Sequence, residues 1–331
     1  MNKNVIEKII KASGIKAGEL VLLHFWGETE EEGVLNDFME AVVAAGAAPF
    51  VLRQSRIRNQ SLFNVAKESC FSEKYFSLFS QVDAVLDIFT CQPVVLGAKL
   101  EDAQMKLYGK YMCDLFGALG KVERFLQIRI PTAANAMESG LEPEDFIQRM
   151  EKAYDIDYDV LKKECKKKCD ELKTTSGVVF TTGDKHKLEI CYEGRTWMSD
   201  AGDGDLPCGE VFIAPVENRT QGEIFYETLF LEDVGVFKNV TFSVKGGVVQ
   251  YSDNPQVNAF LAELSEQDRT VCELGFGMNE QVNDLCGYTV LDEKMQDTFH
   301  IAIGSNVMFG GKNQANLHMD FVGKAVEVIY R

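Results

Sequence analysis

Five ionisable side chains in the second half of the sequence have the types and the surroundings expected of metal ligands. They are two imidazoles and three carboxylates: Glu210, Glu273, His300, His318 and Asp320. Each lies in a short apolar segment edged by small residues, namely GEVFIAPVE (209–217), CELGFG (272–277), FHIAIG (299–304) and NLHMDF (316–321). Ionisable groups rarely occur in such segments unless they are paired or bound to a metal. The set therefore predicts a site for divalent cations.

The spacing of these residues suits β-strands. His318 and Asp320 are two positions apart, so in a strand both side chains point to the same face. His300 would share its face with Ala302 and Gly304, which are small enough to leave room for a ligand. The apolar residues between them would pack into the core, and the ligands would then be held on rigid elements.

The charge of the set indicates how many ions it would hold. Three carboxylates bring three negative charges, and two divalent ions with a bridging hydroxide balance them better than one ion does. Two ions would lie roughly 3.5–4 Å apart, share a carboxylate and activate a water molecule. Mixed oxygen and nitrogen ligands suit zinc, cobalt or manganese, and iron is an alternative.

Three further residues are candidates for the same site. Glu293, in LDEK, is either a third acid near the site or a helix cap, and either it or Glu273 would carry the catalytic proton. Arg195, in EGRTW, would bind a substrate carboxylate or a metal ligand, or form a structural ion pair. Glu217 would be an accessory substrate-binding base or a loop acid.

The first half of the chain alternates between strand-like and helix-like segments. Apolar runs at 20–26, 48–55, 84–90 and 125–132 read as strands, and helical patterns such as 33–46 and 106–120 separate them. This alternation predicts a parallel sheet with helices on both faces. No G-x-G-x-x-G follows the first strand, where Gly27 precedes the acidic run ETEEE, so we expect no nucleotide site there.

The pattern changes after a charged helical stretch at 140–174. From about 176 the segments are short, β-rich and separated by glycine turns, with one helix expected near 254–268. We therefore predict an α/β N-terminal domain at 1–175 with a parallel sheet. A mixed-sheet α+β C-terminal domain at 176–331 would hold the metal.

Composition narrows the function classes. The net charge of −17 repels phosphate backbones and anionic lipid, which argues against nucleic acid and membranes as partners. Nine scattered cysteines without a C-x-x-C pair suggest reduced thiols. The first residues lack the apolar core of a signal peptide, and no apolar run approaches ~20 residues, so we expect a cytoplasmic protein.

Long segments of the chain resemble the thermophilic-type metallo-aminopeptidases, the aminopeptidase T and aminopeptidase S family. They include IKAGELVLLHF and RIPTAANA in the N-terminal half, and EGRTWMSDAGDGDLPCGEVFIAPVE, CELGFGMN, LDEKMQDTFHIAIG and FGGKNQANLHMDF in the C-terminal half. The resemblance implies that the five metal ligands of the family fall on Glu210, Glu273, His300, His318 and Asp320. It also implies two divalent ions that share a carboxylate, removal of N-terminal residues from small peptides, and a homodimer.

Two departures from this family point to an alternative. The stretch at 305–309 lacks the tyrosine that the family's peptidases carry there, and the usual H-W-D reads His318-Met319-Asp320. Loss of a group that stabilises the transition state would slow hydrolysis by ~10²–10³. The H-x-D pattern also resembles 2,5-dihydroxypyridine dioxygenases, which hold a single ferrous ion and cleave a small aromatic ring. Acidic residues at both 210 and 273 favour the hydrolase.

Overall fold

The computed structural model describes residues 1–232 and 234–331, and it divides into two compact units. Unit 1 comprises Met1–Tyr158 with Gly202–Pro207, and unit 2 comprises Asp159–Ala201 with Cys208–Arg331. The predicted boundary at 175 lies three residues beyond the end of helix α8 (Tyr158–Leu172). Almost all of that helix belongs with unit 2, and a short return segment belongs with unit 1.

Unit 1 is built on the predicted parallel sheet. Its strand order is β2-β1-β3-β4-β8, and every pairing is parallel. The strands are β1 (Leu20–Trp26), β2 (Ala48–Gln54), β3 (Ala84–Phe89), β4 (Arg124–Arg129) and β8 (Asp205–Leu206). All six residues of β3 are buried, as expected for a central strand with both faces covered.

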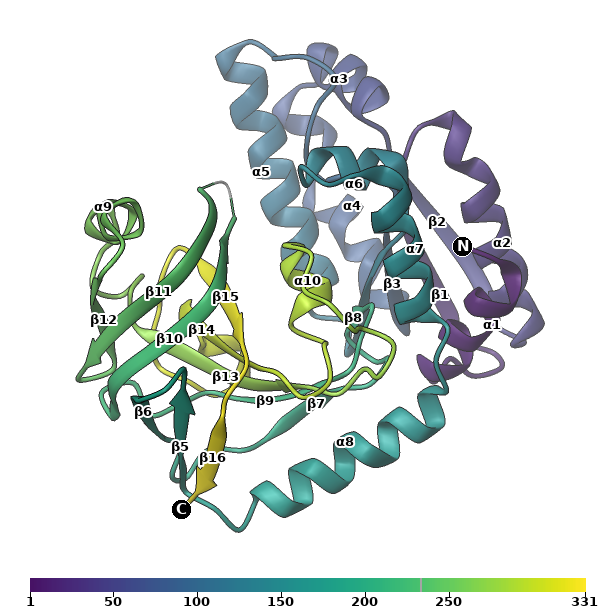
Figure 1. Ribbon diagram of the computed structural model, residues 1–331. Helices are drawn as coiled ribbons and strands as arrows, with labels where there is room; N and C mark the ends of the chain where they lie inside the picture. Colours follow the sequence, from purple (N-terminus) through teal and green to yellow (C-terminus); the bar gives the residue numbers. More distant parts are fainter. Residues whose placement is uncertain (233) are drawn as a thin grey trace. The chain divides into compact units, whose positions relative to one another are not determined.

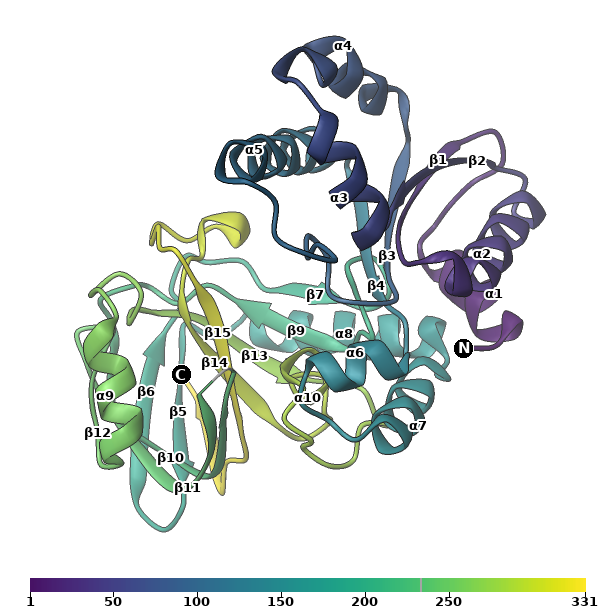
Figure 2. The same ribbon diagram turned by 90° about the horizontal axis from the view of Figure 1, so that it is seen from above.

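Helices cover both faces of this sheet (Figures 1 and 2). α1 (Lys3–Ala12) and α2 (Glu32–Ala44) lie on one side, and α5 (Asp102–Leu119) lies on the other. The remaining helices of unit 1 are α3 (Arg56–Val65), α4 (Glu73–Phe76), α6 (Ala133–Glu138) and α7 (Pro143–Tyr154). One cluster of apolar side chains joins the sheet to α3 and α5, including Leu22, Phe63, Val85 and Leu115. The predicted α/β architecture of the N-terminal half is therefore confirmed.

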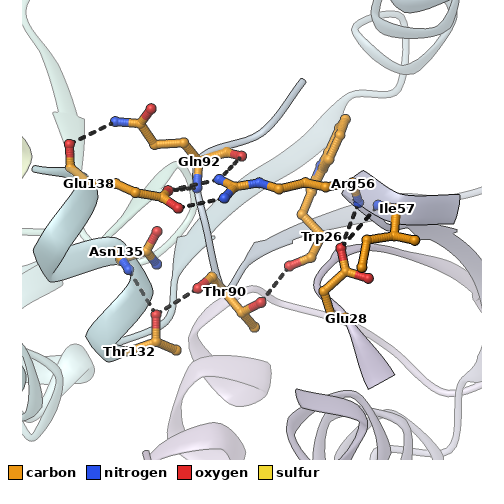
Figure 3. A network of polar contacts seen from close by, with 9 residues as sticks. All are labelled: Trp26, Glu28, Arg56, Ile57, Thr90, Gln92, Thr132, Asn135 and Glu138. Carbon is orange, nitrogen blue, oxygen red and sulfur yellow. Dashed lines mark hydrogen bonds and ion pairs between the residues drawn. The ribbon is translucent and has the colours of Figure 1, made fainter. Parts of the chain in front are cut away.

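A polar network connects the segments that follow these strands (Figure 3). The Arg56 guanidinium donates to both oxygens of Glu138, at 2.6 and 2.8 Å. Glu28, just after β1, accepts hydrogen bonds from the backbone N–H groups of Arg56 and Ile57 at the start of α3. The donors that a phosphate would use at this helix N-terminus are thus bonded to a carboxylate of the chain itself.

Unit 2 contains two sheets whose strands pair in antiparallel fashion. The first has the order β12-β11-β10-β6-β5-β16, and the second has the order β15-β14-β13-β9-β7. The strands of the first are β5 (Gly177–Thr182), β6 (His186–Cys191), β10 (Thr220–Leu231), β11 (Gly235–Lys245), β12 (Val248–Ser252) and β16 (Glu327–Tyr330). Those of the second are β7 (Met198–Asp200), β9 (Glu210–Ile213), β13 (Val271–Gly277), β14 (Phe299–Gly304) and β15 (His318–Gly323). Two helices follow strands of this unit, α9 (Pro255–Glu263) and α10 (Thr289–Asp292).

Aromatic side chains fill the space between the two sheets. Phe299 of β14 lies 4.7 Å from Phe180 of β5, and Phe321 of β15 lies 5.3 Å from Phe242 of β11, between ring centroids. Because successive residues of a strand point to opposite faces, the neighbours of these phenylalanines, His300 and Asp320, face away from this core. No helix of the described residues has the length and apolar character needed to cross a bilayer.

Candidate metal centre

Strand register brings the predicted ligands to one face of the second sheet. Glu273 of β13 lies beside Ala302 of β14, and Ala302 lies beside Asp320 of β15. Glu210 opens β9 opposite Gly277 of β13. Because paired residues of antiparallel strands point to the same face, carboxylates from three strands converge there. The residues that separate the carboxylates in this register, Ala302 and Gly277, are small.

The five side chains form two overlapping groups of potential ligands that share Glu273. Ligand atoms of Glu210, Glu273 and His300 lie within 4.8 Å of one another, and so do those of Glu273, His318 and Asp320. His300 Nε2 is 3.3 Å from Glu210 Oε2 and 3.4 Å from Glu273 Oε1. Glu273 Oε2 is 3.2 Å from His318 Nε2, which is 3.4 Å from Asp320 Oδ2. Glu273 thus presents one carboxylate oxygen to each group.

The donor atoms of this cluster fit a metal. His318 Nδ1 lies 3.0 Å from the Ser305 carbonyl oxygen, to which it can donate, so that in the neutral ring a metal-binding lone pair on Nε2 would point toward Glu273 and Asp320. His300 Nε2 and Asp320 Oδ1 are buried, and neither has a hydrogen-bond partner within the described residues. Unsatisfied buried polar atoms are uncommon in proteins, and a bound ion is one of the accepted explanations.

Burial differs between the two groups. His300 has no exposed surface, and Glu210 and Glu273 are 8% and 7% exposed. The His318 side chain is 34% exposed, whereas that of Asp320 is 12% exposed. Solvent can therefore reach the cluster at His318, while the group of Glu210, Glu273 and His300 is enclosed.

Gly275 makes room for one of the imidazoles. It pairs with His300 across β13 and β14. A Cβ atom at this position would lie only 1.9 Å from His300 Nε2. Gly275 was not among the predicted site residues, although its distance of two residues from Glu273 places it on the same face of the strand and is the signal that could have indicated it.

A buried lysine belongs to the cluster and was not predicted. Lys294 Nζ lies 2.6 Å from Glu210 Oε1 and 2.6 Å from Glu293 Oε1, and its side chain is 1% exposed. Glu293 is the C-cap residue of α10, and its contact with Lys294 places it beside Glu210. The charges of Glu293 and Lys294 cancel, so the formal charge that metal ions would balance stays at −3. A lysine in LDEK gives no signal of burial, since lysines are almost always exposed.

The acids and imidazoles of the cluster have strongly shifted pKa values, because they are buried close to one another. Burial raises the pKa of Glu210 to about 8, despite the nearby Lys294 ammonium. Burial would also raise the pKa of Glu273, but the approach of both imidazoles outweighs it and brings that pKa to about 2. Burial lowers the pKa of His300, but the surrounding carboxylates outweigh that effect and raise it to about 9. Without a metal, protons shared among these groups offset the negative charge, and a divalent ion would displace them.

The two predicted substrate-binding residues pair with each other. Arg195 donates to Glu217 Oε2 at 2.7 Å and also to the carbonyl oxygen of Gly310. The second Glu217 oxygen accepts from the Lys312 backbone N–H at 2.6 Å. The pair thereby braces the segment 306–313 that leads into β15. Their contact with a substrate stays a prediction.

The sequence profile of one protein family matches residues 14–325, which is almost the whole chain. That family is described as thermophilic metalloprotease (M29). The chain belongs to this family. The resemblance inferred from the sequence motifs is confirmed, and the family's chemistry implies divalent metal ions. No curated protein has significant sequence similarity to the chain.

Two solved structures share the fold. AmpT from Thermus thermophilus superposes with a TM-score of 0.72 at 16% identity, over 98% of this chain and 94% of that one. A 2,5-dihydroxypyridine dioxygenase from Pseudomonas putida KT2440 superposes with a TM-score of 0.63 at 12% identity, over 97% and 91%. At these identities the likeness shows a common fold, and both predicted relatives have it.

Proposed function

We propose that this metalloprotease-family member is an aminopeptidase-class hydrolase that uses two divalent ions. Glu210, Glu273 and His300 would hold one ion, and Glu273, His318 and Asp320 would hold the other. The observation that supports this arrangement is the Glu273 carboxylate, with one oxygen in each ligand group. Zinc, cobalt and manganese suit this mixture of oxygen and nitrogen donors.

When bound, such an ion pair supplies an activated water and polarises a scissile amide carbonyl. The chain's own residues would then place the ligands and move the proton. One oxygen of Glu273 lies near His300 and the other near His318, so this carboxylate is better placed to be a ligand shared by both ions than to carry a proton. Glu293 has one oxygen bonded to Lys294, and burial raises the pKa of its carboxyl group. We therefore assign proton transfer to Glu293.

Lys294 would position two acids in this scheme. Its ammonium lies between Glu210 and Glu293 at hydrogen-bonding distance from both. A fixed cation there prevents the two carboxylates from repelling each other and turns Glu210 toward His300. The exposed edge at His318 would admit a small peptide, with Arg195 and Glu217 at the rim.

Metal content and hydrolysis together test the proposal. Protein purified without chelators should carry two ions per chain, and L-leucine p-nitroanilide should be cleaved. Glu293→Gln should lower kcat by at least roughly 10²-fold while two ions stay bound, because general acid–base groups contribute about that much. One ion per chain with no hydrolysis on addition of zinc, cobalt or manganese would contradict the proposal.

The alternative of a single ferrous ion is tested in the same preparation. Anaerobic protein with one iron per chain that consumes oxygen with 2,5-dihydroxypyridine would replace the hydrolase. The fold it shares with such a dioxygenase does not favour that chemistry over hydrolysis, because AmpT has the fold as well. We also propose a homodimer, which light scattering during size-exclusion chromatography would reveal as twice the chain mass of 37.0 kDa.

A further inference from the structure

A pocket of about 350 Å³ lies in unit 2, on the core side of the strands that carry the metal ligands. Its lining includes Phe180, Phe276, Phe299, Tyr330, Lys168 and Asp297. Phe299 directly precedes His300 in β14, so its side chain points to the opposite face of the sheet. None of the five predicted ligands lines the pocket. It is therefore separate from the metal centre.

Aromatic rings form the wall of this pocket. The Phe180 centroid is 6.0 Å from that of Phe276 and 4.7 Å from that of Phe299. Trp197, which does not line the pocket, stacks on Phe276 with 5.8 Å between the ring centroids. Roughly 150 Å³ of apolar space suffices to bind benzene. The volume here therefore accommodates one aromatic ring with a short polar substituent.

Lys168 brings a positive charge to the mouth of the pocket. Its Nζ lies 5.0 Å from the Phe276 centroid and 5.3 Å from the Tyr330 centroid, and it donates to the Tyr330 hydroxyl at 3.1 Å. Within the described residues, no carboxylate lies within 4.0 Å of this ammonium. Its neighbours on α8 differ, because Lys166 pairs with Asp170 and Lys167 with Glu164. In a chain of net charge −17, an ammonium held by rings and lacking a carboxylate partner is available to an anion.

We propose that this pocket binds a small aromatic carboxylate. The ligand's ring would lie within the aromatic lining of the pocket, beside the Lys168 ammonium, and its carboxylate would accept hydrogen bonds from Lys168 Nζ. A cationic ligand is disfavoured, because the Lys168 ammonium already occupies the place over the rings and would repel it. A free aromatic amino acid has the same ring and carboxylate, and its ammonium could meet Asp297 at the rim.

Methyl NMR on the full-length, metal-loaded protein tests this binding. Met278 lines the pocket, so its ¹³C-labelled methyl signal, assigned with Met278→Leu, reports occupancy. Phenylacetate should shift this signal in a saturable way, and benzylamine at the same concentration should not. L-Phenylalanine binding more tightly than phenylacetate would identify amino acids as the source of the ligand, and weaker binding would identify simple aromatic acids.

A pair of lysine variants assigns the carboxylate contact. Lys168→Met keeps the apolar stem and should weaken phenylacetate binding at least about tenfold, since a hydrogen bond to a charged group is worth about 1.5–3 kcal/mol. Lys166→Met, on the same helix and away from the pocket, should leave the affinity unchanged. Carboxylates that bind the metal centre instead would be insensitive to Lys168→Met. That insensitivity, equal binding of benzylamine, or an unmoved Met278 signal at millimolar ligand would overturn the proposal.

Discussion

Replacing Gly275 by alanine should remove His300 from the metal centre. The added Cβ would lie 1.9 Å from His300 Nε2 and 2.3 Å from Cε1. Non-bonded carbon contacts lie at about 3.5–4.0 Å, so the imidazole would have to retreat by roughly 1.5 Å. A metal–nitrogen bond of about 2.0–2.1 Å tolerates only ~0.2 Å of error. The displaced ring could then no longer serve as a ligand.

The expected loss of affinity is large. Disturbing the groups that merely orient a ligand typically costs 10–100-fold, so loss of the ligand itself should cost at least about 100-fold. The backbone of Gly275 lies outside the left-handed region, so strain from φ adds nothing. Overpacking should also lower the free energy of unfolding of the metal-free protein by about 1–3 kcal/mol.

Competition with a chromophoric chelator would measure the affinity of each ion, and circular dichroism would confirm that the variant folds. Gly117→Ala is the matched control, because a Cβ there meets no atom within 4 Å and the residue lies inside helix α5. The control should bind metal as the wild type does and gain up to ~1 kcal/mol of stability from helix propensity. A folded Gly275→Ala protein that binds both ions with wild-type affinity would refute the geometry proposed for His300.

Three further predictions concern the metal ions and unit 1. His318→Ala should reduce the ions bound per chain from two to one, as counted by plasma mass spectrometry, because Glu210, Glu273 and His300 stay in place. Metal affinity should fall as the pH drops below about 9, because the raised pKa of His300 keeps its ring protonated and a metal ligand must be neutral. Calorimetry in buffers of different ionisation enthalpy should therefore show that metal binding releases protons at pH 7. Metal binding without proton release would show that the His300 ring is already neutral at that pH. Glu138→Gln should destabilise unit 1 by about 1–2 kcal/mol at pH 7. Burial alone would raise the pKa of Glu138, but the hydrogen bonds from Arg56 outweigh it and lower that pKa below its unfolded value. The stabilisation therefore exists above pH ~4.5 and is lost as the pH falls further. In acid, the free energy of unfolding of the wild type should approach that of the variant.

Much of the fold follows from local patterns in the sequence. The run LVLLHFW coincides with β1, and the glycine-terminated pattern at 33–46 corresponds to α2. The five predicted ligands lie in strands β9, β13, β14 and β15. These predictions succeed because burial of an apolar face imposes a period of two on strands and 3.6 on helices, and both periods can be read without knowing the neighbours.

Which charged side chains belong to the site, and which of them pair with each other, could not be predicted from local sequence patterns. Lys294 is buried between Glu210 and Glu293, which come from different segments of the chain, and its burial depends on both carboxylates being there. Arg195 and Glu217, two candidates for substrate binding, form an ion pair with each other, which neither segment encodes by itself. Whether a charged side chain pairs or stays available is decided by groups distant in sequence.

The sequence by itself determined which residues could bind metal and that His318 and Asp320 point the same way, because alternation along a strand is a property of the backbone. The tertiary structure decided that β13 lies between β9 and β14, so that each oxygen of Glu273 faces a different imidazole and Gly275 lies under His300. The order and register of antiparallel strands are set by the packing of whole sheets and by the turns between them. A single segment cannot specify its own neighbours.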